Sequence, residues 1–218
     1  MKRFHLLCVF VVGCADVTAI EDGARYGDVV VVQDWFTSIG LVEIGDTTLM
    51  IDAGFRPDKV NAALLERGVE PGAVDHVLLT HGHDDHIGAL EIYPNATVWA
   101  MAEEADALAE SEVRDVETLE VGISQLGDIE VEAFLMVGHT LGSAAYRIGD
   151  VLMMGDTALL NRDGVLTTVP EKRSEDPDGA EAALLALAVA VQDREDISWV
   201  VPSHSGGGSI DALKALAE

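Results

Sequence analysis

The chain has 218 residues, 49 % of them apolar, and a formal net charge of −26 at pH 7. This length and apolar content suffice for one continuous hydrophobic core, so we expect a single folded domain. The negative charge repels polyanions at long range, which disfavours nucleic acid and other strongly anionic partners. We therefore expect a small-molecule partner and no nucleic acid.

The beginning of the chain has the layout of a secretory signal peptide. Lys2 and Arg3 form a positive start, residues 6–12 are an apolar run, and small residues lead to Cys14. The run is too short to span a bilayer as a permanent helix. We expect residues 1–19 to be a signal peptide with a short tether, and residues 20–218 to be the folded domain.

Residues 11–14 (Val-Val-Gly-Cys) resemble the lipobox of bacterial lipoproteins, in which Cys14 would carry the lipid. An ordinary signal, cleaved for instance after Ala15, is the alternative. Both predict export from a bacterial cytoplasm, either to the periplasm or to a membrane through lipidated Cys14. Cys8 and Cys14 are the only cysteines, so the mature domain has no internal disulfide and no thiolate metal ligand.

Short apolar and β-branched runs alternate with helical patterns through the rest of the chain. Strands are expected at residues 29–32, 39–44, 48–51, 77–79, 97–100, 129–137, 144–148, 151–154 and 199–201. Helices are expected at residues 57–67, 101–110, 179–193 and 210–218, and a polar surface loop at 161–178. The order of these elements predicts an α/β fold in which two β-sheets pack face to face with helices on the outside.

A cluster of polar residues follows the strand predicted at residues 77–79. It reads Thr80-His81-Gly82-His83-Asp84-Asp85-His86. Buried side chains of this kind would each need a polar partner, whereas a metal ion satisfies several of them at once. His81 and His83 can point to one side of an extended loop, while Asp85 and His86 can face a second position. Imidazole with carboxylate suits zinc, iron or manganese.

Three single residues follow other predicted strands in the same way. His139 follows residues 129–137, Asp156 follows residues 151–154, and His204 follows residues 199–201. Each alone is more often structural, but five of the seven histidines fall in these loops. Loops at strand ends are a common place for an active site, so we expect them to meet there.

The pattern resembles the metallo-β-lactamase superfamily, whose hallmark is His-x-His-x-Asp-His followed by a distant His, Asp and His. The likeness covers nearly all of the mature chain. It runs through Ile51-Asp52-Ala53-Gly54, His81 to His86, Gly138-His139-Thr140-Leu141-Gly142-Ser143, Gly155-Asp156-Thr157 and Pro202-Ser203-His204. The resemblance implies a four-layer αββα sandwich of two mixed β-sheets flanked by helices.

The resemblance also implies a role for each residue of the site. His81, His83 and His139 would hold one metal, and Asp85, His86 and His204 the second. Asp156 would bridge the two metals. Asp52 would lie beneath the site and orient ligands without binding metal. Two Zn²⁺ per chain are expected, with iron or manganese also compatible.

This ligand set implies a dinuclear metal-dependent hydrolase. A metal-bridging hydroxide would attack an ester, thioester, lactone or lactam, with the first three preferred. Asp85 and Asp156 would be the catalytic residues. Both would orient the nucleophile, and Asp85 could pass a proton to the departing atom.

The bridging position of Asp156 is similar to glyoxalase II-like thioesterases, lactonases and phosphodiesterases, and unlike most β-lactamases. The glycine-cysteine-glycine-arginine run of glyoxalase II is missing, however, and only fourteen residues follow His204. Classical glyoxalase II activity is therefore disfavoured. Three alternatives stay open: a persulfide dioxygenase with one iron on His81, His139 and Asp156; a β-lactamase; and a non-catalytic metal-binding module.

Two pairs of neighbouring residues have an undecided placement. Trp35 and Phe36 lie between the first two predicted strands, where they form either a flap over the pocket or part of the core. Tyr146 and Arg147 are adjacent on a predicted strand, so alternation allows only one of them to face inward.

Overall fold

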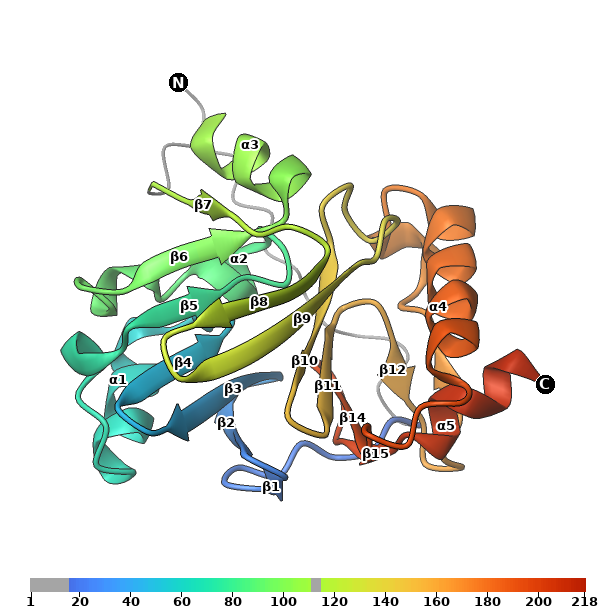
Figure 1. The fold of residues 1–218 in the computed structure, drawn as a ribbon, viewed down its shortest axis with the longest axis horizontal. Coiled ribbons are helices and arrows are strands. Elements are labelled where there is room, and N and C mark those ends of the chain that lie inside the picture. Colours follow the sequence, from blue (N-terminus) through green and yellow to red (C-terminus); the bar gives the residue numbers. More distant parts are fainter. Residues whose placement is uncertain (1–15, 111–114) are drawn as a thin grey trace.

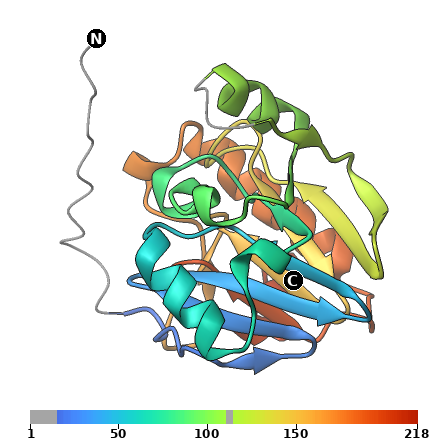
Figure 2. The ribbon, with the colours of Figure 1, turned by 90° about the vertical axis from the view of Figure 1, so that its left-hand side faces the viewer.

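The computed structural model describes residues 16–110 and 115–218, so the predicted lipobox and Cys14 lie outside the described residues. Two mixed β-sheets pack face to face, and helices cover their outer faces (Figure 1). Seen from the side, helix α1 (Pro57–Glu66) lies over the strands of the first sheet (Figure 2). Within the described ranges, no helix has the length and apolar character that a membrane crossing requires.

The first sheet has seven strands in the order β1 to β7. Its first four strands form an antiparallel meander, and the last three add to it in parallel. The strands are β1 Arg25–Tyr26, β2 Val29–Asp34, β3 Thr37–Ile44, β4 Thr47–Ile51, β5 His76–Leu78, β6 Thr97–Ala100 and β7 Glu117–Thr118. The parallel strands are reached through α1, α2 (Asp84–Ile87) and α3 (Ala102–Glu110).

The second sheet has the order β15-β14-β11-β10-β9-β8, in which β11 and β14 pair in parallel. Its strands are β8 Gly122–Leu126, β9 Ile129–Leu135, β10 Ala144–Ile148, β11 Val151–Gly155, β14 Trp199–Pro202 and β15 Gly208–Ser209. Helices α4 (Pro177–Val191) and α5 (Asp211–Lys214) cover it, and β12 (Leu159–Leu160) pairs with β13 (Leu166–Thr167) beside it. Short 3-10 helices occupy Pro71–Ala73, Leu90–Ile92, Glu171–Arg173 and Ala215–Ala217.

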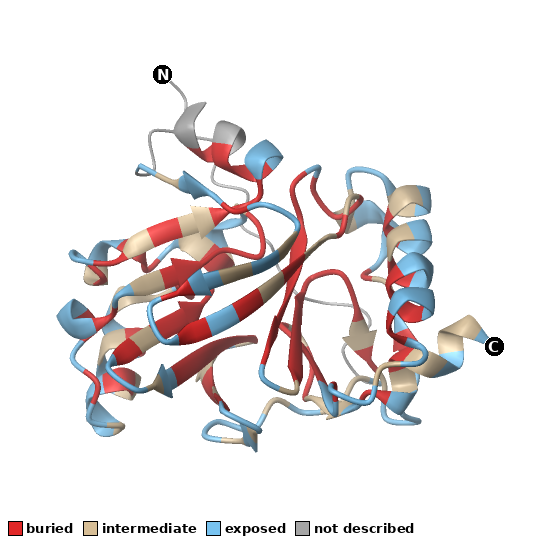
Figure 3. Cartoon of the chain, in the orientation of Figure 1, coloured by how far each residue is buried: buried red, intermediate tan, exposed pale blue. Residues whose placement is uncertain are grey.

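Three apolar cores separate the four layers: one between α1 and the first sheet, one between the sheets, and one between the second sheet and α4. Strand β11 is buried along its whole length (Figure 3). Val151 and Met153 face the core between the sheets, whereas Leu152 and Met154 face α4. Burial on both faces explains why this strand is apolar throughout. The predicted α/β sandwich is confirmed.

The boundaries of several elements differ from the sequence-based prediction. Helix α4 begins at Pro177 because the Asp176 side chain caps it, accepting a hydrogen bond from Gly179 N at 3.1 Å. The helix predicted over residues 210–218 is an α-helix only over Asp211–Lys214 and continues as a 3-10 turn. Strand β8 was missed because exposed residues alternate along it, including Ile123.

The alternation expected for Tyr146 and Arg147 is present. Tyr146 lies in the core between the sheets, and its hydroxyl donates a hydrogen bond to the Leu79 carbonyl oxygen at 2.8 Å. Arg147 lies on the opposite face, where Nε donates to Glu132 Oε2 at 2.6 Å. Tyr146 therefore ties β10 to the end of β5, immediately before the predicted ligand loop.

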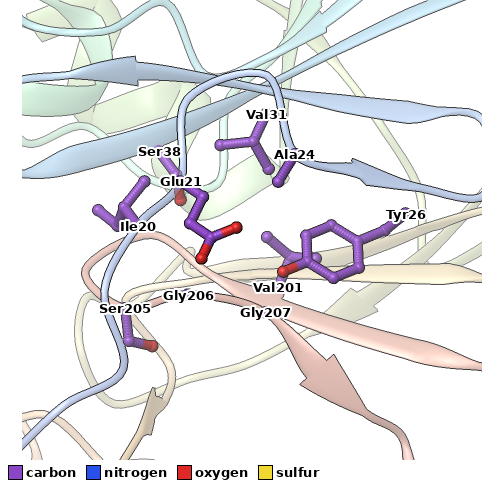
Figure 4. A pocket seen from close by; sticks show the side chains of 10 residues that line it. All are labelled: Ile20, Glu21, Ala24, Tyr26, Val31, Ser38, Val201, Ser205, Gly206 and Gly207. Carbon is purple, nitrogen blue, oxygen red and sulfur yellow. The ribbon is translucent and has the colours of Figure 1, made fainter.

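The start of the described chain packs against the loop after β14. Thr18 Oγ1 donates to the carbonyl oxygens of Leu160 and Gly206, both at 3.1 Å. A shallow hollow beside this contact lies between the N-terminal segment and β14–β15, and Glu21 and Tyr26 line it (Figure 4). None of its lining residues is a predicted metal ligand.

Candidate metal centre

All seven predicted ligand residues come together where strands of the two sheets end. The His81 to His86 loop follows β5, the His139 loop joins β9 to β10, and Asp156 and His204 follow β11 and β14. Their nitrogen and oxygen atoms form three overlapping groups, each within 4.8 Å: His81, His83 and His139; His81, His86 and Asp156; and Asp85, His86 and His204.

Three imidazole nitrogens meet in the first group. His81 Nε2 lies 2.9 Å from His83 Nδ1, and His139 Nε2 lies 3.1 Å and 3.0 Å from these two atoms. A neutral imidazole has one N–H and one lone pair, so direct hydrogen bonds cannot satisfy all three contacts equally. One divalent ion that accepts a lone pair from each nitrogen would satisfy all three, since zinc binds imidazole nitrogen at about 2.0–2.1 Å.

The group formed by Asp85, His86 and His204 contains two imidazoles and a carboxylate. Asp85 Oδ2 lies 3.3 Å from His204 Nε2 and 3.7 Å from His86 Nε2. The other nitrogen of each histidine donates elsewhere: His86 Nδ1 to Asp52 Oδ2 at 2.7 Å, and His204 Nδ1 to the Phe36 carbonyl oxygen at 3.0 Å. In the neutral rings, these bonds leave the two Nε2 lone pairs directed at the cluster.

Asp156 lies between the group of His81, His83 and His139 and the group of Asp85, His86 and His204. Its Oδ2 is 3.1 Å from His204 Nε2 and 3.4 Å from His139 Nε2, while its Oδ1 is 3.3 Å from His86 Nε2. Among the described residues, Asp156 Oδ1 and His86 Nε2 are buried atoms without a well-formed hydrogen bond. Buried polar atoms of this kind are normally satisfied, so the donor set fits metal ions on both sides of Asp156.

Asp52 lies directly beneath this cluster. Its carboxylate accepts hydrogen bonds from Thr80 N at 2.8 Å, from Thr80 Oγ1 and from the His86 ring. The backbone of Asp52 is left-handed, with a φ of 63°, a conformation that aspartate tolerates better than most residues. Asp52 thus contacts both ends of the ligand loop, which is the placement expected for an orienting carboxylate.

The turn between β2 and β3 forms one wall of the site. Trp35 is 59 % exposed, which excludes a core position for its ring, and the ring centroid lies 4.6 Å from that of Phe36 and 6.2 Å from that of Phe55. The Phe36 ring in turn lies 5.6 Å from the His204 ring. This arrangement favours the flap interpretation for Trp35.

Burial and charge divide the histidines into two classes. Burial holds the pKa of His81 well below its ordinary value and lowers that of His139 to about 4. Burial opposes charge on His86 and His204 as well, but neighbouring carboxylates prevail. Asp52 and Asp156 hold the pKa of His86 well above its usual range, and Asp156 raises that of His204 to about 10.

A cavity of about 180 Å³ adjoins His83. It is lined by Gly82, His83, Glu103, Glu104, Thr140, Leu141 and Glu175. The structure thereby places Glu104, which the sequence analysis did not single out, against the ligand loops. Its local sequence is that of an acidic first helical turn, so only its tertiary contacts distinguish it.

The sequence profile of the metallo-β-lactamase superfamily matches residues 32–204. The chain belongs to this superfamily. Residues 32–204 include all seven predicted ligands and Asp52, together with the strands that carry them.

Curated members of the superfamily differ in their named activities. The chain is 27 % identical over 116 residues to the exodeoxyribonuclease WalJ of Streptococcus pneumoniae, covering 49 % of this chain and 43 % of WalJ. It is 34 % identical over 113 residues to the hydroxyacylglutathione hydrolase of Edwardsiella ictaluri, covering 50 % and 41 %. The probable metallo-hydrolase YqgX of Bacillus subtilis is 29 % identical over 167 residues, covering 58 % and 74 %. The chain thus spans less than half of the first two relatives.

Solved structures share the fold at low identity. A B3 metallo-β-lactamase with an active-site glutamic acid superposes with a TM-score of 0.69 at 17 % identity, covering 93 % of this chain and 88 % of that one. The dizinc quorum-quenching lactonase AidC superposes with a TM-score of 0.62 at 16 % identity, covering 79 % and 75 %. These likenesses show a shared fold, which different chemistries use.

The opposed histidine shifts predict a stability maximum near pH 6.5 for the metal-free protein. Because the folded-state pKa values of His81 and His139 lie below 6.5, unfolding takes up protons as the pH falls, and stability decreases toward pH 4. The folded-state pKa values of His86 and His204 are raised. The stability that these two histidines contribute to the fold is therefore present below pH 6.5 and is lost as the pH rises toward 10.

Urea unfolding in excess chelator between pH 5 and pH 9 measures this profile. In His204→Asn, the free energy of unfolding should decrease less between pH 6.5 and pH 9. Its decrease below pH 6.5 should be unchanged. A free energy of unfolding that rises steadily from pH 6.5 to pH 9 in the metal-free protein would contradict the assignment.

Proposed function

We propose that the protein is a dinuclear metal-dependent hydrolase acting on a small ester, thioester or lactone. The observation that carries this proposal is the position of Asp156, whose two oxygens lie 3.1–3.4 Å from nitrogens of both ligand groups. A carboxylate so placed suits a bridge between two ions. His81, His83 and His139 would hold one ion, and Asp85, His86 and His204 the other.

Two bound ions would supply a hydroxide nucleophile near neutral pH and stabilise the negative charge that develops on the attacked oxygen. Asp156 and Asp85 would accept hydrogen bonds from the nucleophile and orient it. Asp85 is 20 % exposed in its side chain, so it has access to the solvent side of the cluster and can pass a proton to the leaving atom. Asp52 accepts a hydrogen bond from His86 Nδ1–H and would thereby keep the Nε2 lone pair available to an ion.

The surroundings of the site favour a neutral substrate with an apolar part. Trp35 and Leu141 are exposed beside it, and Glu103, Glu104 and Glu175 line the cavity next to His83. Carboxylates along that wall repel anionic groups, as does the net charge of −26. For this reason a lactone or simple thioester fits better than DNA, the substrate class named for WalJ, or a glutathione conjugate.

The ligand assignment predicts two zinc ions per chain. His86→Ala removes a ligand of the second position only, so it should retain about one ion and lose at least about 100-fold in hydrolysis. Elemental analysis of protein lacking the leader measures the ions, and His76→Ala, a histidine outside the cluster, is the control. A variant that keeps two ions refutes the assignment. One iron in the parent protein would instead favour the persulfide dioxygenase alternative.

A substrate panel tests the reaction class. We expect lactones and thioesters with acyl chains to be hydrolysed faster than β-lactams and DNA. Trp35→Ala should raise KM for long acyl chains, by about tenfold, and leave kcat for short ones unchanged, because the exposed ring contacts the apolar part and not the reacting bond. Preferred turnover of β-lactams or DNA would reject this substrate class.

We also propose that the protein is exported, with Cys14 as a lipid anchor. The basic start, the short apolar run and the Val-Val-Gly-Cys segment support this. Cys14→Ala should move the protein from the membrane fraction to the soluble fraction in a bacterial host. If the substitution leaves the protein in the membrane fraction, the lipoprotein assignment is wrong. If the protein stays in the cytoplasm with its leader uncleaved, the proposed export is wrong.

A further inference from the structure

Glu104, in the first turn of α3, is a buried carboxylate that contacts two separate ligand loops. We propose that Glu104 is a positioning residue that fixes His81, His83 and His139 relative to one another and so sets the affinity of the first metal position. The inference rests on the proposed metal-binding function and assigns a role to a residue outside the His-x-His-x-Asp-His motif.

Each oxygen of Glu104 accepts a short hydrogen bond from a different loop. Oε1 accepts from Gly82 N at 2.6 Å, and Oε2 accepts from Thr140 Oγ1 at 2.6 Å. Gly82 lies between His81 and His83, and Thr140 directly follows His139. Because hydrogen bonds to a charged acceptor are the strong ones, a single side chain ties together the backbone segments that carry all three imidazoles.

The loop that carries His139 is closed around the same contact. Ser143 Oγ accepts a hydrogen bond from Thr140 N at 2.9 Å and lies 2.9 Å from Thr140 Oγ1. The Thr140 hydroxyl, which donates to Glu104, is thus held in place by Ser143. Movement of the loop away from α3 would break the contact with Glu104.

Two glycines allow α3 to approach this closely. A Cβ atom at Gly82 would lie 2.7 Å from Glu104 Oε1, and one at Gly142 would lie 2.6 Å from Glu104 Cβ. Both separations are too short for real side-chain contacts. Glycine at positions 82 and 142 therefore lets the first turn of α3 pack directly against both ligand loops, where Glu104 is only 5 % exposed.

This arrangement bears on metal affinity for two reasons. Three lone pairs must meet one ion at nearly fixed distances, so any rotation of one loop against the other weakens binding. In addition, a negative charge held close to the site in a poorly hydrated environment favours a bound cation. Glu104 supplies both the link and the charge.

The test compares zinc binding to the two positions by competition with a chromophoric chelator. Glu104→Ala removes both hydrogen bonds and should weaken the first position, that of His81, His83 and His139, by about 10- to 100-fold while sparing the second. Glu104→Gln keeps an acceptor for Gly82 N without the charge and should give an intermediate loss. Glu117→Gln, which changes an exposed carboxylate on β7 outside the cavity, is the control and should bind as the parent does.

Two further measurements separate positioning from general destabilisation. Thr140→Val removes one hydrogen bond with little change in volume and should weaken the same position, while Thr140→Ser restores it. In Co²⁺-substituted protein, the absorption bands of only one position should shift in Glu104→Ala. Equal weakening of both positions, in step with the loss of metal-free stability, would overturn the proposal, as would parental affinity in Glu104→Ala.

The two proposals fail in different ways. If the parent binds a single ion, the dinuclear function is wrong, yet the affinity of that ion in Glu104→Ala still decides whether Glu104 positions ligands. If the parent binds two ions and both remain tight in the variant, only the role of Glu104 is refuted.

Discussion

The burial of Asp156 among imidazoles is the constraint on which the rest of the site depends. A carboxylate removed from water requires compensating positive charge. In the metal-free protein His86 and His204, whose pKa values are raised, supply it, and the His139 ring packs beside them. The arrangement requires strands of both sheets to end side by side. Backbone hydrogen bonds join the sheets at that point, from Ser38 N to the Ser203 carbonyl oxygen and from Ala144 N to that of Thr80.

The site and its scaffold make different demands on the sequence. Strands such as β10 and β11 are buried on both faces and carry almost no polar residues apart from the Tyr146 hydroxyl and the Arg147 ion pairs. The polar groups of the site lie instead in the loops that follow the strands. Substrate preference can therefore change through the loops while the sandwich persists, which is why fold likeness alone names no substrate.

Local signals in the sequence were enough for the layers and for the ligand cluster. Apolar runs bounded by turns predicted most strands, and the spacing of His81, His83, Asp85 and His86 predicted their convergence. Features that depend on tertiary packing could not be predicted. Strand β8 lies at a sheet edge with exposed Ile123, and Glu104 resembles any acidic residue at a helix start until the glycines opposite it are seen.

The turn between β2 and β3 and the first residue of β3 contact two of the predicted ligands. The Phe36 carbonyl oxygen accepts a hydrogen bond from His204 Nδ1, and the Thr37 hydroxyl donates to Asp85 Oδ2 at 3.3 Å, while the neighbouring Trp35 faces solvent. The proposed substrate contact of Trp35 and the contacts to two predicted ligands of the second position thus come from three consecutive residues. Changes to this turn that adapt it to a new substrate are therefore expected to alter the metal affinity of the second position as well. Substrate preference and metal retention would then evolve together.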